Sequence, residues 1–144
     1  MTSWKRSIRT VIDVWICAVL FGAAAFGAQQ TSESAGEQFV GTWTGMWEGA
    51  GSSGGFELTL ERNKDGAVTG RVSVTGEPTY KAIFKTLSFD GKKMSARYDF
   101  PPDEAAEVVL GATFDGNTAK GTWSLREKAQ DREAFAGTWS VEKK

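Results

Sequence analysis

The chain has 144 residues, of which 17 are basic, 18 are acidic, one is cysteine and none is histidine. The lack of histidine excludes serine–histidine and cysteine–histidine catalysis, as well as every zinc site that needs an imidazole ligand. The formal net charge of −1, which becomes more negative once the basic N-terminus is set aside, argues against nucleic acid or an anionic membrane surface as a partner.

The first 28 residues have the pattern of a secretory signal peptide. Three basic residues up to Arg9 precede an apolar stretch, Val14 to Ala28, that ends in small residues. This order is typical of an export leader with a signal-peptidase site, and the stretch is short for a membrane span. We therefore expect a secreted or periplasmic protein, cleaved between Ala23 and Gln30, that does not insert in a membrane. An uncleaved anchor helix is the alternative.

The rest of the chain divides into a spacer, residues 29–38, and one domain, residues 39–144. The spacer reads QQTSESAGEQ; it is polar and aperiodic, which predicts a flexible segment. Cleavage removes three basic residues and one acid, leaving 14 basic against 17 acidic side chains, a net charge of −3. It also removes the only cysteine, so we expect no disulfide. The remaining length suits one domain with one core.

From Phe39 onward, apolar and polar residues alternate with a period of two, which predicts β-strands. Each run has one apolar face, and no convincing helix interrupts the pattern. Eight such runs follow one another, within residues 39–47, 56–60, 68–74, 83–89, 94–100, 108–114, 119–125 and 135–141.

Turn residues give the two ends of these strands different characters. Asp-Gly pairs recur every 25 residues, at 65–66, 90–91 and 115–116, and predict tight hairpins at one end. The other end collects longer polar connections, around 49–55, Pro78, Pro101 and Arg126. We predict an all-β fold, an eight-stranded antiparallel up-and-down β-barrel, since closure removes exposed strand edges. An open sandwich is the alternative.

The stretch GAGSSGG, residues 49–55, matches the G-x-S-x-G pattern of serine hydrolases around Ser53. That pattern needs a strand-to-helix turn and a histidine base. Here it lies between two predicted antiparallel strands in a chain without histidine. We therefore interpret Ser53 as a loop residue in a glycine-rich, flexible flap.

The sequence Gly41-Thr42-Trp43 on the first strand, repeated as GTW at 121–123 and 137–139, resembles the lipocalins and their calycin relatives. Small bacterial lipocalin-like domains of exported proteins share this pattern over residues 40–142. The resemblance implies that Trp43 closes the narrow end of a barrel and that residues 49–55 cover its mouth. It also implies that a basic residue of the last strand, Lys143 or Lys144, packs on Trp43.

A second, weaker resemblance is to avidin-like barrels. It rests on the first GTW followed by DGAVTG, Asp65 to Gly70. The polar positions that avidins use for biotin hold Gly45, Val72 and Val74 in this chain. The resemblance therefore extends to the barrel and not to biotin binding.

Candidate catalytic carboxylates occur in pairs, which is the arrangement that glycoside hydrolysis uses. By alternation those on strands point outward, and the others fall in a turn, so we interpret them as a solvated surface. Nothing clusters them as a metal site. We expect a non-enzymatic protein without a cofactor or metal. The pairs are Glu57 and Glu61, Asp99 and Asp103, and Glu104 and Glu107.

Two functions from different classes remain open. The first is the binding of a small hydrophobic or amphipathic molecule inside the barrel. The second is a structural or protein-interaction module whose barrel is filled by side chains, since an eight-stranded barrel permits both. If the interior is a binding site, the resemblance implies that its upper part is lined by Trp47, Phe56, Tyr98, Phe100 and Trp123.

Lys85 is the only charged residue that alternation places inward in the central part of a strand, beside Ile83 and Leu87. A lone ammonium group in apolar surroundings is costly unless an anion pairs with it. We hypothesise that Lys85 meets the head group of an amphipathic, anionic ligand. The alternative is that a bulge turns Lys85 outward, or that its stem lets the charge reach water.

Overall fold

The computed structural model describes residues 35–144. The predicted signal peptide, its cleavage region and residues 29–34 of the predicted spacer lie outside the described residues. The described part contains one short 3-10 helix and nine strands: η1 (Glu37–Phe39), β1 (Gly41–Gly49), β2 (Ser52–Arg62), β3 (Val68–Val74), β4 (Tyr80–Ile83), β5 (Thr86–Asp90), β6 (Lys93–Asp99), β7 (Ala106–Asp115), β8 (Thr118–Glu127) and β9 (Arg132–Lys143). Within residues 35–144, no helix has the length and apolar character needed to cross a membrane.

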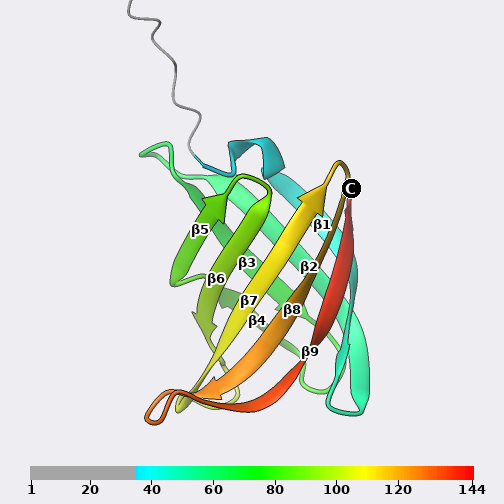
Figure 1. The fold of residues 1–144 in the computed structure, drawn as a ribbon, viewed down its shortest axis with the longest axis vertical. Coiled ribbons are helices and arrows are strands. Elements are labelled where there is room, and N and C mark those ends of the chain that lie inside the picture. Colours follow the sequence, from blue (N-terminus) through cyan, green and yellow to red (C-terminus); the bar gives the residue numbers. More distant parts are fainter. Residues whose placement is uncertain (1–34) are drawn as a thin grey trace, which may run out of the picture. The chain divides into compact units, whose positions relative to one another are not determined.

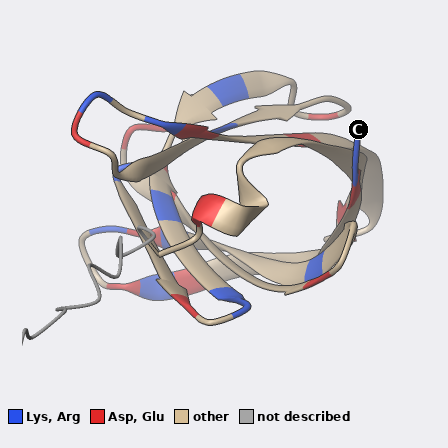
Figure 2. Cartoon of the chain, turned by 90° about the horizontal axis from the view of Figure 1, so that it is seen from above, with Lys and Arg blue, Asp and Glu red and all other residues tan. Residues whose placement is uncertain are grey.

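All nine strands belong to one antiparallel sheet in the order β4-β3-β2-β1-β9-β8-β7-β6-β5 (Figure 1). Strands that follow one another in the sequence are neighbours, except β4 and β5 at the two edges, and the last strand, β9, pairs with β1. Seen from above, the strands curl around an interior (Figure 2). The prediction of an all-β, up-and-down antiparallel fold is confirmed. The predicted strand number and closure are wrong, because residues 35–144 form nine strands and the ladder is open between β4 and β5.

The opening lies where the sequence predicted a single fourth strand over residues 83–89. That segment divides into β4, which pairs with β3, and β5, which pairs with β6. The backbone N–H of Phe84 donates to the carbonyl of Gly70 at 2.9 Å, and the N–H of Lys85 donates to the carbonyl of Arg97 at 2.7 Å. The backbone therefore pairs with β3 at Phe84 and with β6 at the next residue, Lys85.

This step shifts the alternation of side chains. Phe84 and Leu87, three residues apart, both pack against the core, whereas Ile83 is 75% exposed. The ring of Phe84 occupies the space over Gly70, where a Cβ atom would lie 2.4 Å from the ring. The contact between an aromatic ring and a residue without a side chain thus fixes the new register.

Two of the three Gly-Thr-Trp sequences, at 121–123 and 137–139, pack against each other across neighbouring strands. In the β8–β9 ladder, Gly121 lies opposite Trp139 and Trp123 lies opposite Gly137. A Cβ atom at Gly121 would lie 2.9 Å from the indole of Trp139, and one at Gly137 would lie 2.6 Å from that of Trp123. Each motif therefore supplies one tryptophan and the gap that receives the tryptophan of its partner strand.

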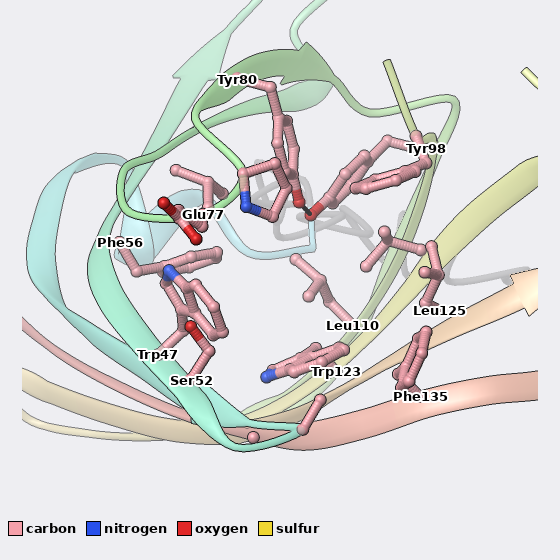
Figure 3. Close-up of a pocket in the computed structure, with 16 residues that line it drawn as sticks. Trp47, Ser52, Phe56, Glu77, Tyr80, Tyr98, Leu110, Trp123, Leu125 and Phe135 are labelled. Carbon is pink, nitrogen blue, oxygen red and sulfur yellow. Dashed lines mark hydrogen bonds between the residues drawn. The ribbon is translucent and has the colours of Figure 1, made fainter. Parts of the chain in front are cut away.

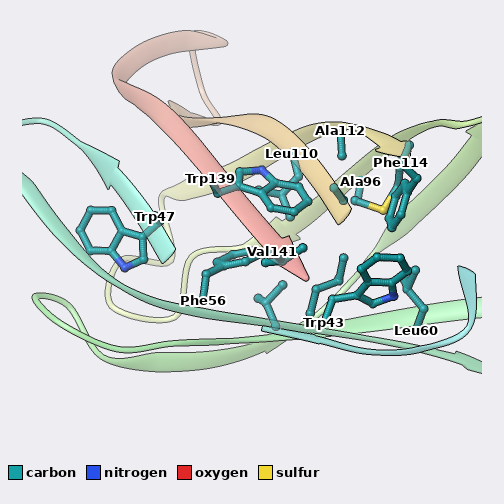
Figure 4. Packing of buried hydrophobic residues seen from close by; sticks show 14 of the residues in the cluster. Trp43, Trp47, Phe56, Leu60, Ala96, Leu110, Ala112, Phe114, Trp139 and Val141 are labelled. Carbon is teal, nitrogen blue, oxygen red and sulfur yellow. The ribbon is translucent and has the colours of Figure 1, made fainter. Parts of the chain in front are cut away.

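The end of the sheet with the Asp-Gly turns is filled by aromatic rings. Trp43 is fully buried and donates its indole N–H to the carbonyl of Phe39 at 2.9 Å. Phe39, from η1, stacks on Phe114 at 4.3 Å between ring centroids, and Phe114 meets Trp43 edge-on at 4.9 Å (Figure 4). Lys143 places its ammonium group 5.5 Å from the Trp43 ring centroid, as the lipocalin resemblance implied. We call this the closed end.

The helix η1 lies across the closed end (Figure 2). Gly36 precedes it with φ of 86°, and the Phe89 ring fills the space where a Gly36 side chain would lie. Glu37 forms an ion pair with Arg62. Glu37 and Gln38, which the sequence assigned to the flexible spacer, are thus part of the helix that covers the closed end.

Candidate functional site

A cavity of about 350 Å³ opens at the end opposite η1 (Figure 3). Most of its walls are aromatic or aliphatic, contributed by strands from both halves of the sheet and by the connections that follow β1 and β3. The lining residues are Trp47, Gly49, Ala50, Ser52, Phe56, Val74, Glu77, Pro78, Tyr80, Tyr98, Phe100, Val108, Leu110, Trp123, Leu125 and Phe135.

Five of the six residues predicted to bind a ligand lie together in this lining: Trp47, Phe56, Tyr98, Phe100 and Trp123. Trp47 and Trp123 meet edge-on with centroids 5.9 Å apart. Each is held by its indole N–H, which donates to the carbonyl of Thr75 at 3.0 Å for Trp47 and to that of Glu48 at 3.1 Å for Trp123. Both rings are therefore fixed in place along one wall of the cavity.

The sixth residue, Lys85, lies on the outer surface, so its predicted inward position is wrong. The register step between β4 and β5 turns it outward, and its ammonium group pairs with Asp99 at 2.9 Å. Asp99 also pairs with Lys128 at 2.8 Å. Hydrogen bonds from Lys128 and then from Lys85 hold the pKa of Asp99 below its usual value. Lys85 therefore has an anionic partner outside the cavity.

The connection between β1 and β2 is a tight hairpin, and the predicted long flap over residues 49–55 is wrong. Only Ala50 and Gly51, with φ of 53° and 77°, lie between the strands. Ser53 is an exposed strand residue paired with Glu48. Gly54 is required by packing, since a Cβ atom there would lie 1.9 Å from the Thr75 carbonyl and 2.7 Å from the Trp47 indole.

The carboxylates considered as catalytic pairs lie outside the cavity lining. Several of them pair with bases on the surface, in Glu61–Arg71, Arg97–Glu107 and Lys144–Glu57. In the part of the chain that the structure describes, no three acidic, cysteine or histidine side chains are grouped as a metal site. Among the described residues that line the cavity, Glu77 is the one that is charged, and it lies at the exposed rim.

A pair of tyrosines supplies the buried polar groups of the cavity. The hydroxyl groups of Tyr80 and Tyr98 lie 2.8 Å apart. Burial raises the pKa of Tyr80 above 10.0 and, together with the neighbouring Tyr80, raises that of Tyr98 well above 10.0. The sequence predicted Tyr98 but missed Tyr80, which it placed in a loop. Alternation of Tyr80, Ala82 and Phe84 is the signal that could have revealed it.

Comparison of the chain with protein-family models, with curated proteins and with solved structures found no match. The geometry of the cavity is therefore the basis on which a function can be argued.

Proposed function

We propose that this domain is an exported, non-catalytic binding protein that holds one small apolar or amphipathic molecule in its cavity, as the resemblance to lipocalin-like barrels implies. The observation that carries the proposal is the cavity itself. Its volume of about 350 Å³ lies within the range of small-molecule sites, which are mostly apolar with a few placed polar groups. Burying apolar ligand surface there is favourable by roughly 25 cal/mol per Å².

The charges at the cavity favour a ligand without negative charge. Lys85, the cation expected to meet an anionic head group, is paired with Asp99 on the surface. Glu77, the only charged residue among the described residues of the lining, is acidic. An anion entering past Glu77 would be repelled and would find no cation among the lining residues. The proposal is therefore restricted to neutral or cationic ligands.

The alternative of a barrel filled by side chains describes the closed end only. There Phe39, Trp43 and Phe114 pack against one another. At the opposite end Trp47 and Trp123 flank the cavity, and this difference favours binding over a purely structural role.

Two related dyes test the proposal. N-phenyl-1-naphthylamine is neutral, whereas 8-anilinonaphthalene-1-sulfonate adds a sulfonate to the same framework; both brighten in apolar surroundings. We expect saturable 1:1 binding of the neutral dye and weaker binding of the sulfonate. Native mass spectrometry of protein purified from its own host would identify the natural ligand. Lack of saturable binding of the neutral dye would contradict the proposal.

A matched pair of substitutions on β7 locates the binding. Val108 faces the cavity and is 3% exposed, whereas Val109 is on the opposite face of the same strand. Val108→Phe should fill part of the cavity and weaken binding of the neutral dye, while Val109→Phe should leave it unchanged. Equal effects of both substitutions would place the dye outside the cavity.

A further inference from the structure

The two tyrosines of the cavity are the only tyrosines in the chain, and they come from strands on opposite sides of the open ladder. Tyr80 lies on β4 and Tyr98 lies on β6. Figure 3 shows their hydroxyl groups meeting between the two rings, at the side of the cavity. The 2.8 Å separation of the oxygens allows one hydrogen bond, in which either hydroxyl donates.

One O–H group of this tyrosine pair lacks a hydrogen-bond acceptor among the described residues. Two phenol groups carry two O–H donors, and their mutual hydrogen bond uses one. In the described part of the chain, neither hydroxyl has another side-chain or backbone partner. Tyr98 is 1% exposed, and its surroundings in the cavity include Phe100, Val108 and Leu110. One O–H donor of this part-buried pair therefore has no protein acceptor within residues 35–144, which is unfavourable unless another molecule supplies one.

Both hydroxyls keep their protons at neutral pH, because burial raises both pKa values. The pair therefore offers a donor to whatever occupies the cavity. A hydroxyl that accepts one hydrogen bond is polarised into a better donor, so the second O–H is strengthened by the first bond.

We propose that the Tyr80–Tyr98 hydroxyl pair is a specificity site that selects an apolar ligand carrying an uncharged oxygen acceptor, such as a ketone, ester or ether oxygen. This inference rests on the proposed function and adds the chemical class of the ligand. The acceptor group sits at the tyrosine pair, and the apolar body of the ligand lies along Trp47, Phe56 and Trp123. A hydrocarbon of the same shape leaves the donor unpaired.

Two naphthalenes of similar shape test this selection, because 2-acetylnaphthalene has a carbonyl group where 2-ethylnaphthalene has a methylene. A neutral hydrogen bond of ordinary strength corresponds to a preference of about threefold to tenfold for the ketone, measured by calorimetric titration. The infrared carbonyl stretch of the bound ketone should move to lower frequency than that of the same ketone in hydrocarbon solvent.

The informative variant is Tyr80→Phe combined with Tyr98→Phe. Either single substitution leaves one hydroxyl with its proton available, so each should retain part of the preference. The double variant removes both donors, and it should bind the two naphthalenes equally and restore the carbonyl frequency. Ser53→Ala, which removes a hydroxyl from an exposed strand residue outside the cavity lining, is the control and should keep the full preference.

The possible outcomes distinguish a failure of this inference from a failure of the proposed function. Binding of neither naphthalene to the parent protein overturns the proposed function and the inference together. Binding of both with equal affinity and an unshifted carbonyl stretch keeps the proposed function and overturns the inference. A ketone preference and frequency shift that persist in the double variant also overturn it, because the donor would then be another group.

Discussion

The closed end of this sheet and the opposite end, which we call the open end because the cavity opens there, are built from the same kinds of residues and differ in what fills them. At the closed end, η1 brings Phe39 onto Phe114, with ring centroids 4.3 Å apart, and Trp43 is fully buried. At the open end, Trp47 and Trp123 meet at 5.9 Å and border a cavity of about 350 Å³. Aromatic content alone therefore does not decide whether a curled sheet is filled. At the closed end, η1 adds the ring of Phe39 to the packed core.

The largest effect should come from Trp43→Ala at the closed end. Truncation of a fully buried aromatic side chain typically costs about 3–5 kcal/mol of unfolding free energy. Trp123→Ala at the open end should cost less, because Trp123 is only partly buried, but it should weaken binding of the neutral dye. Urea denaturation of both variants gives the comparison. A Trp43→Ala loss of less than about 1 kcal/mol, well below that range, would contradict the assignment of the closed end.

Phe39→Ala tests whether η1 stabilises the closed end. The side chain is 6% exposed and stacks on two other rings, Phe89 and Phe114. We expect a loss of roughly 3 kcal/mol, at the lower end of the range for buried aromatic truncation, together with unchanged dye affinity at the opposite end. If stability is unaffected in urea, the helix does not hold the closed end together.

Alkaline pH should weaken the open end through its tyrosines. Both have pKa values above 10.0 in the folded chain, while in the unfolded chain they ionise near pH 10. Above that pH the unfolded chain loses protons that the folded chain retains, so the unfolding free energy falls as pH rises. Below about pH 9 the tyrosines add no pH dependence.

The double variant with Phe at positions 80 and 98 isolates this effect from the lysines, which titrate in the same range. Its stability should fall less steeply than that of the parent above pH 10. Parallel curves for the two proteins would show that the tyrosines ionise as readily in the folded chain as in the unfolded one.

The smallest effects should come from two residues that sequence patterns singled out. Lys85→Met removes an exposed ion pair that solvent screens, so it should change stability little and leave the affinity for both dyes unchanged. Ser53→Ala changes an exposed strand residue and should alter stability by no more than about 0.5 kcal/mol. A change in dye affinity in Lys85→Met would place this lysine at the ligand after all.

Alternation of apolar residues predicted the all-β antiparallel sheet, because one face of each strand is buried, and the lipocalin resemblance implied five residues of the cavity lining. Alternation failed at Lys85 because the pattern is read within a strand, and the register changes between Phe84 and Lys85. The signal was Gly70, whose missing side chain makes room for the Phe84 ring, but that contact joins residues distant in sequence.

The glycines of the first hairpin misled the prediction for a related reason. Glycine in a polar stretch suggests flexibility, yet Gly54 is a strand residue that lets the Trp47 indole pass. Gly121 and Gly137 are likewise strand residues that leave space for the rings of Trp139 and Trp123. The closing role of η1 was also missed, because Phe39 was read as the start of a strand and its preceding residues as a spacer.

We distinguish a closed end that is filled by side chains from an open end that binds a ligand. The most direct test of this distinction is a ligand titration monitored by nuclear magnetic resonance of the indole N–H signals. Trp43 marks the closed end, and Trp47 and Trp123 mark the cavity. With N-phenyl-1-naphthylamine, the account predicts saturable shifts of the Trp47 and Trp123 signals and an unmoved Trp43 signal. Movement of the Trp43 signal while those of Trp47 and Trp123 stay fixed would contradict it.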